Sequence, residues 1–191
     1  MSVAVKTPLD KETACALQVG VKVMISGVIY VMRDAAHKRL IELMEKGAPL
    51  PMELQGQIVY YAGPCPAKPG QVIGSVGPTT SGRMDVYTPA LLDKGLMGMI
   101  GKGQRSKAVV DSIIKNGAVY FAAIGGAGAL LAVSVKEAQV VAFPELGAEA
   151  IYRLTVKDFP AIVAIDSRGK DLYVSGKETY LKMVNEKTVK A

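Results

Sequence analysis

The chain has 191 residues, of which half are hydrophobic and 21% are charged, and it contains 20 glycines. This length and composition are typical of one globular domain over residues 1–191 and exclude a disordered tail. The formal net charge of +6 allows a nucleic acid, an anionic surface or a small anionic substrate as the partner. Nucleic acid is disfavoured, because the aromatic residues are few and are not interleaved with Lys and Arg as a base-stacking surface requires.

Cysteine usage and hydropathy bear on the compartment. Cys15 and Cys65 are too few for a disulfide framework, and residues 1–8 lack the apolar core of a signal peptide, so we expect a cytoplasmic protein. Residues 118–135 carry no charge and have the length of a membrane-spanning helix. The glycine cluster at residues 125–128 interrupts that segment, which favours a buried strand, a tight turn and a small-residue helix over a membrane span.

The apolar pattern predicts the elements of the first third in chain order. Residues 21–32 are rich in β-branched side chains and alternate in polarity, which indicates one or two strands. Apolar residues recur at helical spacing over 34–46, and Gly47 follows where a helix would end. Residues 47–55 form a predicted loop, and residues 58–62 a further strand.

Three similar units follow, each a predicted strand, a loop and a helix. The predicted strands are residues 72–76, 96–100 and 118–124, and the helices after them are 79–95, 106–116 with Gly117 as its cap, and a last one that ends at about residue 132. This repeat is typical of a parallel α/β layer. In such a layer the loops after the strands gather at one edge of the sheet, and ligands bind there.

The last third of the chain is β-rich again. Residues 138–143, 151–156 and 161–165 are short predicted strands, and residues 176–189 have helical spacing and a high Lys content. A chain that is β-rich at both ends around α/β units indicates layered β/β/α packing and not a symmetric doubly wound sheet.

Residues 77–85 (GPTTSGRMD) are the most informative segment of the chain. They follow the predicted strand 72–76 and open a predicted helix, so that Pro78 and Thr79 leave backbone N–H groups free at its start. Thr79 and Arg83 are four residues apart and therefore share a face of its first turn. A hydroxyl, a guanidinium and free amides at a helix N-terminus predict an anion-binding site.

Basic residues recur in the other loops that follow predicted strands. Arg33, Lys102 and Arg105 lie in loops that we expect at the same edge of the sheet as Arg83. Taken singly, such a residue is usually solvated surface. Arg binds a carboxylate or a phosphate through two parallel hydrogen bonds, and Lys supplies a point charge. The group therefore predicts a small dianionic ligand with a carboxylate at each end.

His37 is the only histidine, and it lies four residues after Arg33. It is either a packed or capping residue, or a catalytic or substrate-orienting one. One histidine and two cysteines from separate segments can supply neither a His-based metal site nor the ligands of an iron–sulfur cluster, so we expect no metal ligands in this chain. Glu145 and Glu149 are interpreted as cap and surface residues.

With these residues assembled, the chain closely resembles the β subunit, or C-terminal domain, of the iron–sulfur-dependent class I fumarases and L-tartrate dehydratases. The resemblance runs from about residue 8 to about residue 159. It rests on ordered strings: SGVIY at 26–30, RDAAHKR at 33–39, YAGP at 61–64, GPTTSGRMD at 77–85, GKGQRS at 101–106, FPELG at 143–147 and KDFP at 157–160.

This resemblance implies an α/β fold of the swivelling β/β/α three-layer type. It also implies that a [4Fe–4S] cluster is held by an iron–sulfur α subunit, not by this chain, within a hetero-oligomer. Family members contact a C4 dicarboxylate through residues that correspond to Arg33, Thr79, Arg83 and Lys102. These four are the candidate substrate-binding residues, and Thr79, Arg83 and His37 are the candidate catalytic residues.

The implied activity is a hydro-lyase reaction that needs the α subunit. An iron of the cluster would act as a Lewis acid on the departing hydroxyl, while the arginines hold the carboxylates and stabilise the developing charge. The residue matching Thr79 is the family's proposed base, although a positioning role suits an aliphatic hydroxyl better. The main expectation is fumarate hydratase, which interconverts fumarate and (S)-malate. L(+)-tartrate dehydratase, which converts tartrate to oxaloacetate, and a non-catalytic anion-binding module are the alternatives.

Overall fold

The computed structural model describes residues 2–188, and within them seven strands form one sheet in the order β1-β2-β3-β4-β5-β7-β6. The strands are β1 (Val3–Lys6), β2 (Lys22–Val31), β3 (Ile58–Tyr60), β4 (Gly98–Gly101), β5 (Val119–Ala122), β6 (Val135–Ala142) and β7 (Ile151–Ile165). From β1 to β5 neighbouring strands are parallel, whereas β7 runs antiparallel to β2, β5 and β6. The fold is therefore of the mixed α/β class.

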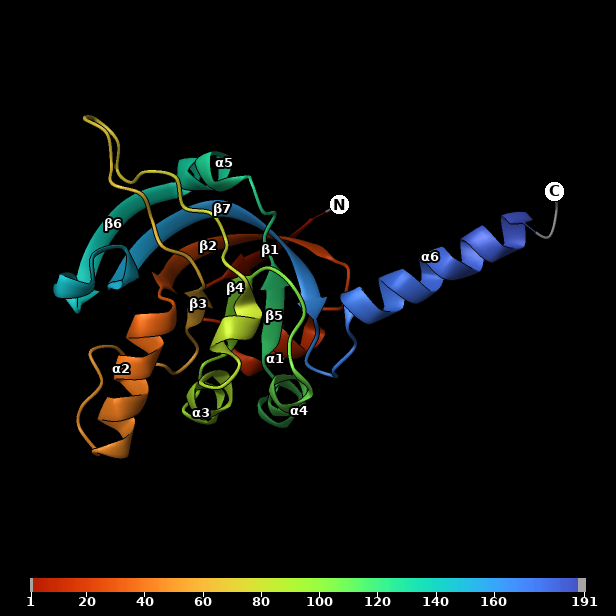
Figure 1. Ribbon diagram of the computed structural model, residues 1–191, viewed down its shortest axis with the longest axis horizontal. Coiled ribbons are helices and arrows are strands. Elements are labelled where there is room, and N and C mark those ends of the chain that lie inside the picture. The colour runs from red at the N-terminus through yellow and green to blue at the C-terminus, as the bar shows by residue number, and fades with distance from the viewer. Residues whose placement is uncertain (1, 189–191) are drawn as a thin grey trace.

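The long strand β7 closes the sheet into a small barrel. Its residues 152–162 pair with β2, and residues 162–165 pair with β5. Strands β2 and β5 are the first and last strands of the parallel run β2-β3-β4-β5. Because β7 pairs with both of them, the paired strands complete a ring, as Figure 1 shows. Gly27 breaks the register of β2, and a Cβ there would lie only 2.4 Å from Thr7 Oγ1. The bulge bends β2 toward the closed barrel.

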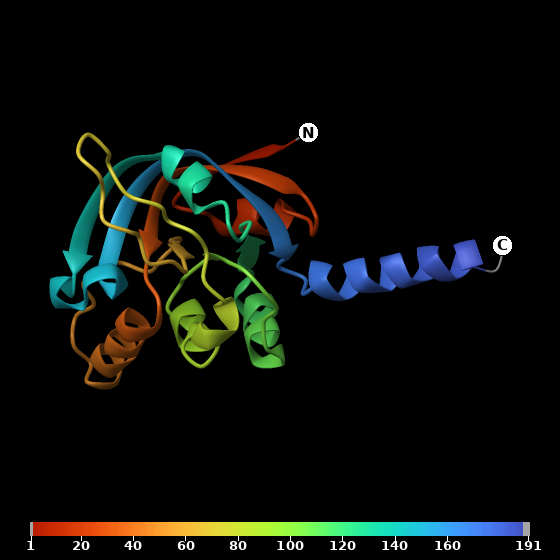
Figure 2. The same ribbon diagram turned by 45° about the horizontal axis from the view of Figure 1, so that its top comes forward.

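Helices cover the barrel unevenly. They are α1 (Lys11–Ala16), α2 (Asp34–Glu45), α3 (Thr88–Asp93), α4 (Lys107–Asn116), α5 (Gly128–Val133) and α6 (Leu172–Thr188), with the 3-10 turns η1 (Ser81–Met84) and η2 (Pro144–Glu149). Figures 1 and 2 show α2, α3 and α4 along one side of the sheet and α5 beside β6. In both views α6 extends away from the rest of the molecule.

Two apolar clusters occupy the two faces of the sheet. Along β3, Ile58 and Tyr60 belong to one cluster and Val59 between them belongs to the other. The second cluster also contains Leu40 from α2 and Leu91 from α3, so it lies between the sheet and its helices. Alternate strand residues therefore face the barrel interior and the helical layer, as the period of two requires.

Local signals correctly predicted several elements. Helix α2 confirms the prediction over 34–46, and α4 confirms the one over 106–116. At the start of α4 the Ser106 hydroxyl accepts the Val109 N–H at 3.4 Å, and at its end Gly117 has a φ of 70°. The predicted helical tail is α6, although Val189 lies outside the described residues.

The predicted strand over 72–76 is wrong. This segment is a loop in which Ile73 and Val76 are buried, so packing and not strand pairing accounts for its apolar residues. The Cys65 N–H donates to the Ser75 carbonyl at 2.9 Å and folds the loop back on itself. The last strand before this loop in the chain is β3.

The single helix predicted to run from about residue 79 to Gly95 is wrong in its continuity. The chain forms η1 and then α3, with Pro89 in the first turn of α3, where a missing N–H is tolerated. The strands predicted over 151–156 and 161–165 are one strand, β7, which runs through Pro160. Around Pro160 only β2 pairs with β7, so one edge of the strand is open and accepts a residue without an N–H.

The uncharged segment 118–135 forms β5, a turn and α5, as predicted. Within residues 2–188, none of the helices combines the length and the apolar character needed to cross a membrane.

Candidate functional site

The loops that follow the four parallel strands β2 to β5 lie at one edge of the barrel and carry the predicted site residues. Arg33 follows β2, and Lys102 follows β4. Thr79 and Arg83 lie in the long connection between β3 and α3. Because these strands are parallel, their carboxyl ends meet at the same edge, where ligands of such sheets bind.

Backbone hydrogen bonds hold the Thr79 segment against the Lys102 loop. The Thr79 N–H donates to the Tyr61 carbonyl at 2.8 Å, and the Ser81 N–H donates to the Lys102 carbonyl at 2.9 Å. In return the Lys102 N–H donates to the Thr79 carbonyl at 3.3 Å. The predicted anion site at a helix N-terminus is therefore wrong, because two of its amides bind backbone carbonyls and the helix is only the four-residue turn η1. The side chains of this segment remain candidates.

Arg83 makes a two-pronged ion pair with Asp34, the first residue of α2. Its Nε donates to Asp34 Oδ1 at 2.9 Å, and its Nη2 donates to Asp34 Oδ2. This hydrogen bonding lowers the pKa of the Asp34 carboxyl below its usual value and raises the pKa of Arg83. Both side chains remain well exposed, at 47% for Arg83 and 36% for Asp34. The pair brings the loop after β2 next to the turn η1.

Arg33 precedes Asp34 and is held by a second carboxylate. Its Nη2 lies 3.1 Å from Glu149 Oε1, and the other oxygen of Glu149 accepts the Ala35 N–H at 3.0 Å. Gly63 covers the guanidinium, since a Cβ at that position would lie 3.0 Å from Arg33 Cζ and Nε. Arg33 Nε is buried and has no hydrogen-bond partner among the described residues. The Arg33 side chain as a whole is 28% exposed.

His37 lies beneath these arginines and is completely buried. Its Nδ1 is 2.9 Å from the Arg33 carbonyl, which can only accept, so the neutral ring carries its proton on Nδ1. Nε2 is then a buried acceptor without a partner among the described residues. Burial lowers the pKa of His37 from 6.5 to about 4, which keeps the ring neutral near pH 7. The geometry joins His37 to the backbone of Arg33.

Lys102 is exposed and extends beside the glycine loop after β5. A Cβ added at Gly125 would lie 3.7 Å from Lys102 Nζ. The absence of a side chain at Gly125 therefore leaves room beside the ammonium group. Thr79 is half-buried, and its backbone pairs directly with that of Lys102.

Arg105 does not belong with the other basic residues, contrary to the expectation from its loop. Its side chain is 0% exposed and forms an ion pair with Asp85, Nε to Oδ1 at 2.7 Å. Its Nη2 donates to Thr88 Oγ1 at 2.8 Å. The guanidinium carbon lies 5.2 Å from the Tyr61 ring centre and 5.0 Å from that of Tyr120. With these partners the buried cation holds the loops together.

Sequence reasoning missed the two carboxylates that hold the arginines. Asp34 is visible in the string RDAAHKR, but nothing local pairs it with Arg83, which lies 49 residues away. Glu145 and Glu149 are interpreted together as cap and surface residues, which does not indicate that Glu149 accepts an amide at the start of α2, 114 residues away in the sequence. Glu145 is a surface residue, as interpreted, 3.7 Å from the exposed Arg39.

The described residues contain no group of three His, Cys, Asp or Glu side chains that could hold a metal ion. Cys15 is half-buried on α1, and Cys65 is exposed in the loop after β3. Two thiols in separate segments do not fit an iron–sulfur cluster, which needs three or four thiolates close together.

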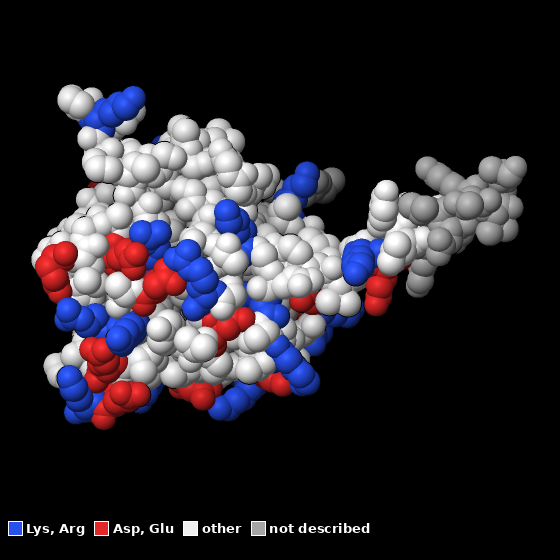
Figure 3. All heavy atoms as spheres, in the orientation of Figure 1, with Lys and Arg blue, Asp and Glu red and all other residues white. Residues whose placement is uncertain are grey.

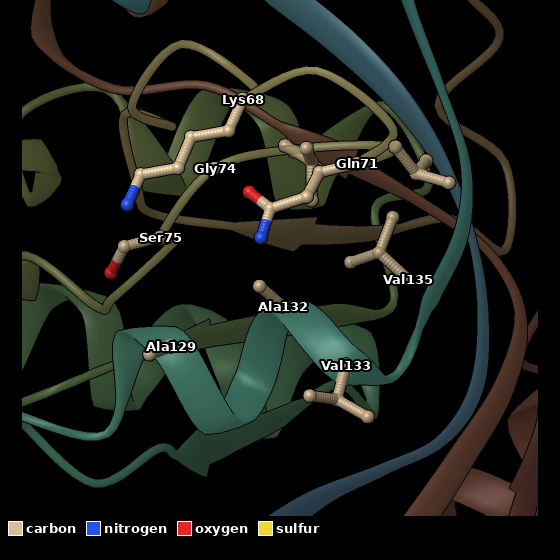
Figure 4. A pocket seen from close by; sticks show the side chains of 10 residues that line it. Lys68, Gln71, Gly74, Ser75, Ala129, Ala132, Val133 and Val135 are labelled. Atoms are coloured by element: carbon tan, nitrogen blue, oxygen red, sulfur yellow. The ribbon is translucent and has the colours of Figure 1, made fainter.

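A separate pocket of about 410 Å³ lies between the loop after β3 and helix α5. Figure 4 shows Lys68, Gln71 and Ser75 on the loop side, opposite Ala132 and Val133. None of the predicted site residues lines it. On the face drawn in Figure 3, acidic and basic side chains lie beside one another, so that face carries no continuous basic surface.

The comparisons with known proteins agree on one family. The family model described as Fumarase C-terminus matches residues 1–176. Fumarate hydratase 2 of Leishmania major is 42% identical over 177 residues, which are 91% of this chain and 31% of that protein. The anaerobic class I fumarate hydratase of Escherichia coli is 44% identical over 157 residues, 81% of this chain and 29% of that protein. The chain thus spans about a third of these fumarate hydratases.

One relative of similar length to this chain is named as a β subunit. "Putative L(+)-tartrate dehydratase subunit beta" of Methanocaldococcus jannaschii is 40% identical over 184 residues, which are 93% of this chain and 94% of that protein.

Proposed function

The chain belongs to the fumarase C-terminus family, and on that premise we propose that it is the β subunit of a hydro-lyase that acts on a C4 dicarboxylate. The observation that carries this proposal is the meeting of Arg33, Arg83, Thr79 and Lys102 at one edge of the barrel. Each of the two guanidinium groups there forms an ion pair, Arg83 with Asp34 and Arg33 with Glu149, and an ammonium group lies on the neighbouring loop. We propose fumarate hydratase as the activity, with water added to fumarate to give (S)-malate.

The architecture supports a finer assignment of the fold. We propose that residues 1–191 form a single domain of the swivelling β/β/α three-layer type. The closed barrel would supply the two β layers, and helices α2, α3 and α4 the third layer, with one apolar cluster on each side of the sheet. The free cysteines, one of them exposed, suit a reducing compartment, and the cytoplasm is the proposed location.

Arg33 and Arg83 would bind the two carboxylates of the substrate. Arg83 already presents two N–H groups in the geometry that a carboxylate accepts, and its present partner is an exposed side chain that a substrate carboxylate can replace. When a proton leaves the carbon beside a carboxylate, negative charge develops on that carboxylate. A guanidinium that is held in place before the reaction stabilises this charge without having to reorient.

Lys102 and Thr79 would complete the grip on the substrate. Lys102 adds a third positive charge from the neighbouring loop, and Thr79, whose backbone pairs with that of Lys102, would contribute its hydroxyl. We assign Thr79 to positioning the substrate, with proton abstraction as the role that the family suggests. His37 would act through Arg33, because it is buried and binds the Arg33 carbonyl.

A [4Fe–4S] cluster would have to be held by a partner α subunit, since the cysteines of this chain do not fit one. The naming of the Methanocaldococcus jannaschii relative as a β subunit supports a two-subunit enzyme. The chain would then contribute the charged groups that grip the substrate, and it would be inactive alone. The same relative favours L(+)-tartrate dehydratase as the second candidate activity, because this chain spans 94% of its length.

Reconstitution with a cluster-bearing α subunit tests the proposal. The complex should convert fumarate to malate, while either subunit alone should not, and a parallel assay with L(+)-tartrate should detect oxaloacetate if the second candidate is correct. A complex with a full complement of cluster that converts neither compound would refute the hydro-lyase assignment. Tight binding of malate or tartrate by the lone chain would instead favour a binding module.

A further inference from the structure

Glu149 makes two contacts that meet at the proposed substrate arginine. Oε1 lies 3.1 Å from Arg33 Nη2, and Oε2 accepts the Ala35 N–H at 3.0 Å. From this arrangement we propose that Glu149 is a positioning residue, which holds the Arg33 guanidinium in the orientation that receives a substrate carboxylate. The inference rests on the proposed function, because that function makes Arg33 a substrate ligand.

The hydrogen bond from the Ala35 N–H to Glu149 restrains the carboxylate that contacts Arg33. The Ala35 N–H belongs to the first turn of α2, where amides have no partner within the helix and a negative charge is favourable. A carboxylate fixed to that amide cannot swing away with the arginine. Glu149 therefore ties the Arg33 guanidinium to the start of α2 from η2, an element that is distant from α2 in the sequence.

The backbone at Gly63 restrains the guanidinium on a further side. The position a Cβ would take there is 3.0 Å from Arg33 Cζ and Nε, and also 3.0 Å from the Ala148 carbonyl oxygen. Arg33 Nε faces this backbone and stays buried without a partner among the described residues. Nη2 is the nitrogen in the ion pair with Glu149, which leaves Nη1 as the nitrogen that we assign to the ligand.

The same two elements carry a natural control. Arg39 of α2 and Glu145 of η2 form an ion pair at 3.7 Å with side chains that are 49% and 55% exposed. That pair links α2 to η2 as Glu149 does, but it touches none of the proposed site residues. Glu149→Gln and Glu145→Gln therefore each remove one negative charge from η2, and only the first removes it from beside Arg33.

Steady-state kinetics of the reconstituted complex test the proposal. Glu149→Gln should raise the KM for the dicarboxylate roughly tenfold and change kcat by less than about threefold, because the amide keeps the Ala35 hydrogen bond but loses the charge that orients Arg33. Glu149→Asp should lie between Glu149→Gln and the unmodified complex, and Glu145→Gln should match the latter. An unchanged or lowered KM in Glu149→Gln overturns the proposal.

A measurement that needs no activity separates this inference from the proposed function. In nitrogen-15 NMR of the full chain alone, a held guanidinium gives resolved Nη resonances, and those of Arg33 are identified by their loss in Arg33→Lys. They should broaden or average in Glu149→Gln and persist in Glu145→Gln; their persistence in both variants overturns the proposal. A complex without hydro-lyase activity refutes the function, while these spectra still decide whether Glu149 holds Arg33.

Discussion

Arg105 and Arg83 lie in neighbouring loops at one edge of the barrel, but their surroundings differ completely. Arg105 is 0% exposed and is bound by Asp85, by Thr88 and by two tyrosine rings. Arg83 is 47% exposed, and its partner Asp34 is exposed as well. A buried cation whose three nitrogens all bind side chains supports structure, whereas an exposed one with a single replaceable partner can receive a ligand.

The buried arginine also places the exposed one. Asp85 binds Arg105 with one oxygen and accepts the Ser106 N–H with the other at 2.6 Å, which links the end of η1 to the start of α4. Arg83 lies within η1 and is therefore carried by a segment that Arg105 fixes. Arg105 holds the loops together at the edge of the barrel, and Arg83 exposes its positive charge at that edge.

The largest effect on the fold is expected from Arg105→Ala. The substitution leaves Asp85 without its cation and opens a space between the rings of Tyr61 and Tyr120, so the free energy of unfolding should fall by about 3–5 kcal/mol. Denaturant unfolding of the lone chain measures it. Lys107→Ala, which removes an exposed cation two residues further along the chain, is the control and should leave the midpoint unchanged. A loss as small as that of the control would show that Arg105 is dispensable for folding.

Arg83→Ala should have the opposite profile. Turnover of the reconstituted complex should fall by at least about a hundredfold, because a preorganised donor to the developing charge is lost. The free energy of unfolding should change by less than about 1 kcal/mol, since the Arg83–Asp34 pair is exposed. Kinetics and denaturant unfolding of the same preparation give both values. Turnover that survives the substitution would remove Arg83 from the site.

His37 is a buried group of a third kind, kept neutral instead of paired. Its pKa is about 4 in the fold and 6.5 in the unfolded chain, so between these pH values the unfolded state binds the extra proton. Stability contributed by the neutral ring is thus present above pH 6.5 and is lost as the pH falls, by about 2 kcal/mol at pH 5. Unfolding curves at pH 7, 6 and 5 should show this slope, and His37→Gln should lack it. If the free energy of unfolding changed equally with pH in the two proteins, His37 would not be the buried group whose lowered pKa causes the pH dependence.

The elements that sequence predicted correctly depend on neighbours in the chain. Helix α4 begins at a Ser106 cap and ends at Gly117 with a positive φ, and both signals lie next to the helix that they bound. The segment 72–76 has the apolar residues of a strand, but Ile73 and Val76 are buried by contacts in the folded molecule without joining the sheet. Periodicity does not distinguish these two ways of burying a side chain.

The candidate site divides in the same way. Loop position and residue type predict Arg33, Arg83 and Lys102 as site residues. By the same two criteria Arg105 cannot be distinguished from them. What separates Arg105 is a pair of tyrosine rings from β5 and the loop after β3, which only the fold brings together. The contact between Glu149 and Arg33 likewise joins distant parts of the chain.

The smallest effect on stability and turnover is expected from the substitution of an exposed arginine that belongs neither to the buried contacts of Arg105 nor to the proposed site. Arg39 lies on α2 with its guanidinium 5.8 Å from the Phe143 ring and 3.7 Å from Glu145, and it is 49% exposed. Arg39→Ala should change the free energy of unfolding by less than about 1 kcal/mol, because water and salt screen such contacts. Turnover of the complex should match that of the unmodified protein within about twofold, since Arg39 touches no proposed site residue. If Arg39→Ala lowered turnover as Arg83→Ala does, charge in general, and not the place of Arg83 at the barrel edge, would account for the activity.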